Sequence, residues 1–205
     1  MFAEDKLTAA EGNYREALEM STQLAAKDIV SGVQLSMGAL ALERGDLTNA
    51  ETTARQVARE AHAAGNVDRE VSAHNLLART LTVKGDLDAA AAEVKAAAQL
   101  PTKDETSKLT WSVTAGELLT RQGKKNEANR VLTDALTQAR KMGYVPGEFQ
   151  ARLALLGVET ASDGRAARLR DIRGLMQDAT KLSFHLIARK AEEIERRVLA
   201  ASAAH

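Results

Sequence analysis

The sequence predicts an all-α protein, built as an α-solenoid of helical hairpins with a capping helix at its C-terminal end. Three observations lead to this fold class. Aromatic residues make up only 3% of the 205 residues while alanine is abundant, which favours closely packed helices over a sheet core. Prolines are limited to Pro101 and Pro146, so long helices are left uninterrupted. Glycines recur at nearly regular spacing, which is typical of a repeat.

The repeat is visible first in its turn glycines. Each is followed by a polar or charged residue, and successive members lie 33, 40, 38 and 41 residues apart: Gly12, Gly45, Gly85, Gly123 and Gly164. Each stands where one apolar helical pattern stops and another begins. We therefore expect turn glycines that adopt a positive φ.

Small residues at fixed distances from these glycines strengthen the pattern. Seven residues before the last four stand Gly38, Ala78, Gly116 and Gly157. Five residues after the turn glycines stand Ala17, Ala50, Ala90, Ala128 and, as the exception, Leu169. A glycine inside a helix costs about 1 kcal/mol relative to alanine. Three at one offset therefore indicate a close approach between the two helices of a hairpin.

With these residues the chain resembles the tetratricopeptide repeat (TPR) family over nearly its whole length. The family's Gly-Asp-Tyr-like turn matches Gly12-Asn13-Tyr14, Gly45-Asp46-Leu47 and Gly85-Asp86-Leu87. Its later small position matches Ala97 and Ala135, with Val57 and Met176 as larger replacements. The resemblance implies a right-handed solenoid. Most repeats of this chain are longer than the family's usual 34 residues. In this respect the chain is most similar to the C-terminal TPR regions of bacterial multidomain signalling and regulatory proteins.

The expected elements follow in order along the chain. We predict helices near residues 3–11, 14–26, 28–43, 47–63, 67–83, 87–99, 104–121, 125–141, 146–161, 165–179 and 182–202. The breaks between repeats fall at Gly65-Asn66, at Leu100-Pro101-Thr102 and over residues 143–147, each with turn-forming residues. The expected organisation is one solenoid over residues 1–205, divided into a partial repeat 1–26, repeats at about 28–65, 67–100, 104–143 and 146–180, and a capping helix 182–203.

The two ends carry separate expectations. Terminal repeats of a solenoid need a cap for their apolar face, and the last segment has one apolar stripe, formed by Leu182, Leu186, Ile187, Ala191, Ile194 and Val198. At the start, Asp5 occupies the offset held elsewhere by glycine or alanine. The residues before Gly12 are therefore expected to make a poor first helix, as if the chain began partway through a repeat.

Composition narrows the function classes. Lys plus Arg and Asp plus Glu are 28 each, whereas a nucleic-acid binder usually carries a basic excess. Cysteine is absent, so disulfides, thiolate metal sites and thiol nucleophiles are excluded. Neither a membrane-spanning stretch nor a secretory leader is recognised. A cytoplasmic protein is expected.

No constellation of catalytic residues emerges, so we expect no enzyme, no cofactor and no metal. The histidines form no helical metal-binding pair, and no phosphate-binding glycine loop is present. His74 is interpreted as a packed or surface residue. Trp111 is either a packing residue or a ligand-stacking one. The basic segment 165–173 is either a solvated helix face or a contact for phosphates or an acidic partner.

The resemblance places a partner in a concave groove lined by the first helices of the hairpins. Counting back from the turn glycines, the predicted groove residues are Leu35, Leu42, Asn75, Arg79, Val113, Glu117 and Arg121. Asn75 can hydrogen-bond a peptide main chain, and Arg79 can bind a carboxylate. The alternative is that the arginines pair with Glu117 and neighbouring acids. The preferred function is a scaffold that binds a protein or peptide, within a larger regulatory protein. A homodimerisation module and, more weakly, a nucleic-acid-associated repeat stay open.

Overall fold

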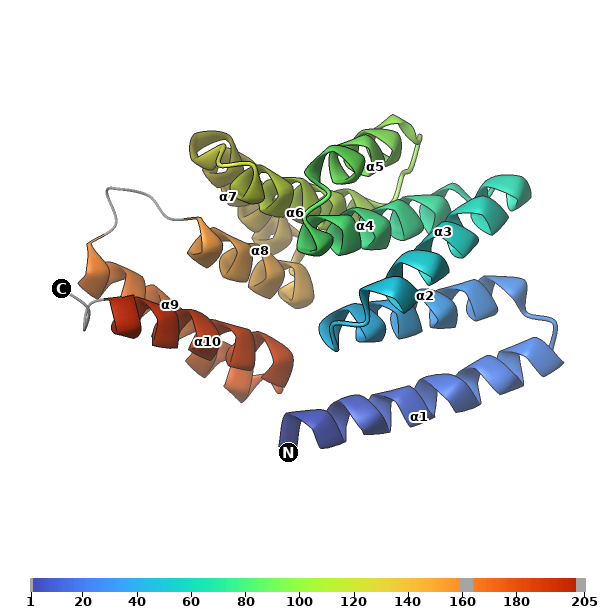
Figure 1. The fold of residues 1–205 in the computed structure, drawn as a ribbon, viewed down its shortest axis with the longest axis horizontal. Coiled ribbons are helices and arrows are strands. Elements are labelled where there is room, and N and C mark those ends of the chain that lie inside the picture. Colours follow the sequence, from blue (N-terminus) through green and yellow to red (C-terminus); the bar gives the residue numbers. More distant parts are fainter. Residues whose placement is uncertain (1, 159–163, 202–205) are drawn as a thin grey trace. The chain divides into compact units, whose positions relative to one another are not determined.

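The computed structural model describes residues 2–158 and 164–201, and within them every regular element is a helix (Figure 1). The all-α class is therefore confirmed. The bounds of the helices are α1 Phe2–Gln23, α2 Lys27–Glu43, α3 Leu47–Ala64, α4 Val67–Lys84, α5 Leu87–Gln99, α6 Glu105–Arg121, α7 Lys125–Met142, α8 Val145–Gly157, α9 Arg165–Lys181 and α10 His185–Ala201.

The chain divides into two compact units, Met1–Thr114 and Ala115–His205, with the boundary inside α6. In the first unit α1 packs against α2, α2 against α3, α3 against α4 and α4 against α5, and α2 also contacts α4. In the second unit α7 packs against α8, α8 against α9 and α9 against α10, and α8 also contacts α10. Contacts between neighbours and next-but-one neighbours are those of a helical repeat.

Turn geometry confirms the predicted ends of the middle helices. Gly45 and Gly85 have φ values of +80° and +90°, a conformation that costs a residue with a Cβ about 1–2 kcal/mol. The next residue in each turn caps the following helix, because the Asp46 carboxylate accepts a hydrogen bond from Asn49 N at 3.1 Å and Asp86 accepts one from Ala89 N at 3.3 Å. Three more glycines have positive φ: Gly65, Gly123 and Gly143.

Close approach of paired helices is confirmed at two of the small positions. A Cβ on Gly38 of α2 would lie 3.2 Å from Thr53 Cγ2 of its partner helix α3, and closer still, 2.8 Å, to Leu76 Cδ2 of α4 in the next hairpin. A Cβ on Gly116 of α6 would lie 2.4 Å from Leu132 Cδ2. After the turns, the matching alanines have no exposed surface: Ala50, Ala90 and Ala128.

The prediction for the first turn is wrong. Gly12 lies inside α1, so the two helices expected at 3–11 and 14–26 are one helix that packs against α2. An exposed mid-helix glycine costs only about 1 kcal/mol, and nothing lies within 4 Å of the place for its Cβ. The residues before Gly12 are therefore helical. The chain turns instead at Ala25, which has a φ of +51°.

The last predicted turn glycine also behaves differently. Gly164 precedes α9 but has a φ of −56°, so it marks a helix start without the left-handed geometry. Residues 159–163, which include the predicted end of the helix at 146–161, lie outside the described residues. Gly157 is the last residue of α8, and no atom lies within 4 Å of the place for its Cβ. It does not mark a close approach.

The last helix buries most of its predicted stripe in the core of the second unit. That core is formed by Phe149, Ile172, Leu175, Ala179 and Ala191, with Ile187, Ile194 and Val198 of α10 packed against it. The rings of Phe149 and Phe184 meet edge to face with centroids 5.0 Å apart, an arrangement that adds stability beyond the buried area. The prediction that Leu182 belongs to the apolar stripe is wrong, because the helix begins at His185 and Leu182 is exposed in the preceding turn. Residues 202–205 lie outside the described residues.

Candidate partner-binding surface

The predicted groove residues lie on the first helices of three hairpins. α2 carries Leu35 and Leu42, and α4 carries Asn75 and Arg79. The helix α6 carries Val113 in the first unit, and Glu117 and Arg121 in the second. The helices α2 and α4 contact each other directly in the first unit.

Four of the seven side chains are buried. The exposed fractions are 8% for Leu35, 8% for Leu42, 4% for Asn75 and 5% for Val113. These offsets therefore lie deeper between neighbouring helices than a groove lining would. Arg79 and Glu117 are half-buried and Arg121 is exposed, so these three are the predicted residues that a partner could reach.

Arg79 is held by an acid on the neighbouring hairpin. Its Nη2 lies 3.6 Å from Oε1 of Glu43, the last residue of α2. The ion pair joins α4 to α2 on the surface where a partner would lie. It is pairing of the kind expected from the alternative interpretation, in which the arginines neutralise acids nearby. A half-exposed pair of this kind contributes little to stability, and a partner's carboxylate could compete for the guanidinium.

Asn75 is the unusual residue of this surface. Its Oδ1 is buried and accepts no hydrogen bond among the described residues. The same offset carries an apolar side chain in the neighbouring hairpins, Leu35 and Val113. A buried acceptor without a partner costs about 1–3 kcal/mol. A buried acceptor without a hydrogen-bond partner therefore lies one helical turn from Arg79.

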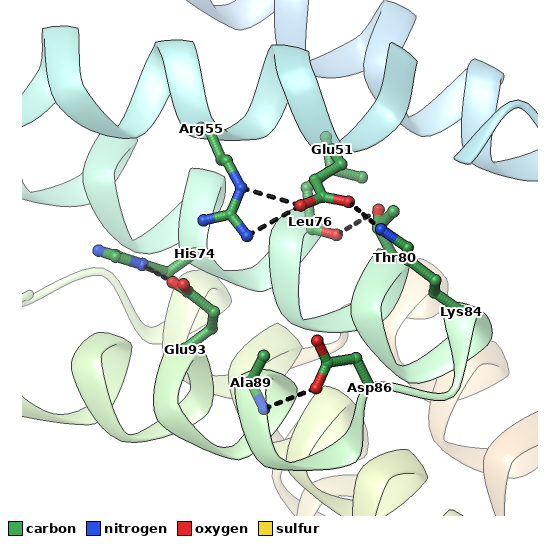
Figure 2. A network of polar contacts seen from close by, with 9 residues as sticks. All are labelled: Glu51, Arg55, His74, Leu76, Thr80, Lys84, Asp86, Ala89 and Glu93. Atoms are coloured by element: carbon green, nitrogen blue, oxygen red, sulfur yellow. Dashed lines mark hydrogen bonds and ion pairs between the residues drawn. The ribbon is translucent and has the colours of Figure 1, made fainter. Parts of the chain in front are cut away.

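A second polar cluster joins α3, α4 and α5, and sequence reasoning missed it (Figure 2). The carboxylate of Glu51 in α3 accepts a hydrogen bond from Arg55 Nη2 at 2.9 Å and one from Lys84 Nζ, on α4, at 3.0 Å. The hydrogen bond from Lys84, followed by the one from Arg55, lowers the pKa of the Glu51 carboxyl. The spacing of Glu51 and Arg55 on one helix could have signalled half of this cluster.

Two histidines also link neighbouring helices of the first unit. His74 Nδ1 lies 2.6 Å from Glu93 Oε2, which links α4 to α5, as Figure 2 shows. His62 Nδ1 lies 2.9 Å from Glu70 Oε1, which links α3 to α4. These pairs fit the interpretation of His74 as a packed residue. Among the described residues, no group of three or more potential ligands is arranged around a common metal position.

Trp111 and the basic segment 165–173, for which two interpretations were open, both make structural contacts. The indole Nε1 of Trp111 donates to the Val94 carbonyl oxygen at 2.8 Å and joins α6 to α5, which favours packing over ligand stacking. In the basic segment, Arg168 donates to the Leu156 carbonyl at 3.2 Å and Arg173 pairs with Glu195 at 2.6 Å. The segment's Ile172 is fully buried, so an amphipathic helix face accounts for its pattern.

Comparison of the chain with protein-family models and with curated proteins gave no match. Of the helices in the described ranges, none is both long enough and apolar enough to cross a membrane.

Proposed function

We propose that this chain is a helical-repeat module of the TPR type that binds a protein or peptide through the surface formed by α2 and α4 in the first unit. The proposal includes the right-handed stacking and the capping role of α10 that the resemblance implies. It places the module in the cytoplasm, as part of a larger regulatory protein, with no catalytic role of its own.

The single observation that carries the proposal is the unpartnered acceptor of Asn75. Its equivalents Leu35 and Val113 show that an apolar side chain fits the same position in neighbouring hairpins. A polar group that weakens the fold is often retained at a functional site, where binding compensates for its cost. Because Asn75 is only 4% exposed, its side chain must turn outward in the proposed complex before Oδ1 can accept a main-chain N–H of the bound peptide.

The half-buried ion pair beside it supplies the second contact. Arg79 holds Glu43 at 3.6 Å, a distance longer than that of a tight charged hydrogen bond. A carboxylate on the partner can therefore replace Glu43 with better geometry. A partner with an extended, acidic segment is the chemistry that fits this pair of groups.

The test is capture of proteins from the lysate of the source organism by the native chain and by two variants. One variant is Arg79→Ala. The matched control is Arg130→Ala, which removes the same charge from an exposed position on α7. We expect a protein held by the native chain and the control and lost by the first variant. Equal capture by all three chains would contradict the proposed surface.

A further inference from the structure

A cleft of about 650 Å³ lies in the first unit, at the end where α1 turns into α2 and α3 turns into α4. Much of its lining is methyl groups, from Ala25, Val30, Ala61, Ala63 and Ala64. Its volume is in the range of sites that hold a ligand or a protruding side chain. None of its lining residues belongs to the predicted partner-binding groove.

Polar contacts hold this cleft open as a preformed shape. Asn66 caps α4 by accepting from Arg69 N at 3.1 Å, and its amide donates to Asp28 Oδ1 at 3.0 Å. The guanidinium of Arg69 donates to the Asp28 carbonyl oxygen at 3.1 Å. These bonds join the first turns of α2 and α4, so the wall between them is fixed before anything binds.

An apolar ridge flanks the same turn. Met20, Leu24 and Ile29 lie within ten consecutive residues, and their exposed fractions are 57%, 75% and 57%. Met20 and Leu24 belong to one helical turn, since Leu24 N donates to the Met20 carbonyl at 3.1 Å. Single exposed apolar side chains are ordinary, but a cluster beside an apolar cleft marks an interaction surface.

Charges of both signs accompany the cleft. Lys27 and Glu60 are exposed lining residues. Within the described ranges Lys27 has no ion pair, and Glu60 accepts a hydrogen bond from Gln56 at 2.9 Å. The surface thus holds a ridge and a cleft, and also a cation and an anion. A two-fold interface uses the same patch on both copies, so it requires this kind of self-complementarity.

We propose that a second copy of this chain docks on this surface as a two-fold dimer. The ridge of Met20, Leu24 and Ile29 on each copy enters the cleft of the other, and Lys27 of each copy faces Glu60 of the other. An unrelated partner would need only one half of this set. The dimer surface is independent of the partner-binding function, and either can fail without the other.

The first test is sedimentation of the full chain over a series of concentrations. We expect the mass to rise from one chain to two. Leu24→Glu would bury a charge in the cleft of the second copy, so its dimer dissociation constant should rise about tenfold or more. The control is Val83→Glu, at another exposed apolar position, on α4, about 20 Å along the helix from Arg69. A single-chain mass for the native protein at all concentrations would overturn the dimer, and equal effects of both variants would overturn this surface.

A charge-exchange experiment tests the two-fold geometry itself. Lys27→Glu and Glu60→Lys should each weaken the dimer, because each places like charges opposite one another. Mixing the two variants in equal amounts should restore a dimer. In the mixed dimer the glutamate introduced in one copy faces the lysine introduced in the other, in the place of one native pair, and the second native pair is retained. An interaction within one chain cannot be repaired by mixing, so failure to restore the dimer would overturn the arrangement.

Discussion

Gly38 and Gly157 stand at the same distance before a predicted turn glycine, in the hairpins α2–α3 and α8–α9, but their surroundings differ. A Cβ on Gly38 would meet Leu76 and Thr53, whereas a Cβ on Gly157 would meet nothing within 4 Å. Their turns differ in the same way. Gly45 has a φ of +80° and is followed by the capping Asp46, while Gly164 has a φ of −56° and its helix has no side-chain cap.

The difference teaches that glycine spacing alone does not define a hairpin of this kind. Three features recur in these hairpins: a left-handed turn residue, an acid that caps the second helix, and a large side chain that fills the space beside the small one. The hairpin α4–α5 has the first two in Gly85 and Asp86. The hairpin α6–α7 has the first in Gly123 and the third in Gly116 and Leu132, but no side-chain cap. Each feature can be removed separately.

The largest effect is expected from filling the tight contact. Gly116→Val would place side-chain atoms where Leu132 Cδ2 now lies, and overpacking of this kind lowers the free energy of unfolding by about 2 kcal/mol or more. Gly157→Val is the matched control and should change it by less than about 1 kcal/mol. Urea denaturation followed by circular dichroism measures both. Equal losses in the two variants would show that the contact at Gly116 is not special.

Replacing glycine with alanine should change the free energy of unfolding in opposite directions at two predicted turn glycines. Gly85→Ala forces a Cβ into a φ of +90° and should lower the free energy of unfolding by about 1–2 kcal/mol. Gly12→Ala replaces an exposed mid-helix glycine and should raise it by about 0.5–1 kcal/mol. Thermal melts of both variants test the pair. A destabilising Gly12→Ala would mean that a turn exists at Gly12 after all.

Loss of the helix cap should lower the free energy of unfolding somewhat less than loss of the turn glycine. Asp86→Ala removes the acceptor for Ala89 N and should lower the free energy of unfolding by about 1 kcal/mol. Asp88→Ala, an exposed acid in the same first turn of α5, controls for the loss of charge. Similar losses in both variants would attribute the effect to the helix dipole rather than to the cap.

The smallest effect concerns acid stability. Because Lys84 and Arg55 lower the pKa of Glu51 in the folded chain, this group stabilises the fold above its unfolded pKa, and the stabilisation is lost as the pH falls through the folded pKa. Glu51→Gln should therefore cost less than about 1 kcal/mol at neutral pH and nothing in strong acid. Denaturation at several pH values measures the difference, with Glu127→Gln as the control. A cost that stayed constant with pH would contradict the ionic origin.

Much of the fold could be predicted because the signals are local. The boundaries between α2, α3, α4 and α5 follow from Gly45, Gly65 and Gly85 with the capping Asp46, Asn66 and Asp86, and the observed ends of these helices lie close to the predicted ones. The continuous α1 could not be predicted from the Gly12-Asn13 pair. A glycine in an exposed helix face costs too little to end a helix.

The candidate site was predictable only in part. Offsets from the turn glycines assigned each residue to its helix, but the burial of Leu35, Asn75 and Val113 depends on how closely neighbouring helices pack. Spacing along one chain does not encode that distance. The same holds for the pair of Arg79 with Glu43, which joins side chains from two different hairpins. The cleft at the α1–α2 turn has no sequence signal, because its lining comes from two stretches, 22–31 and 60–69, that lie far apart in the sequence.

The central claim is that Asn75 is kept for binding at a cost to stability, and Asn75→Leu tests it most directly. The leucine repeats the residue found at the equivalent position of α2, Leu35, and removes the unpartnered acceptor. We predict a free energy of unfolding raised by about 1 kcal/mol together with loss of the protein captured by the native chain. A variant that is less stable, or one that captures the partner as well as the native chain does, would contradict the claim.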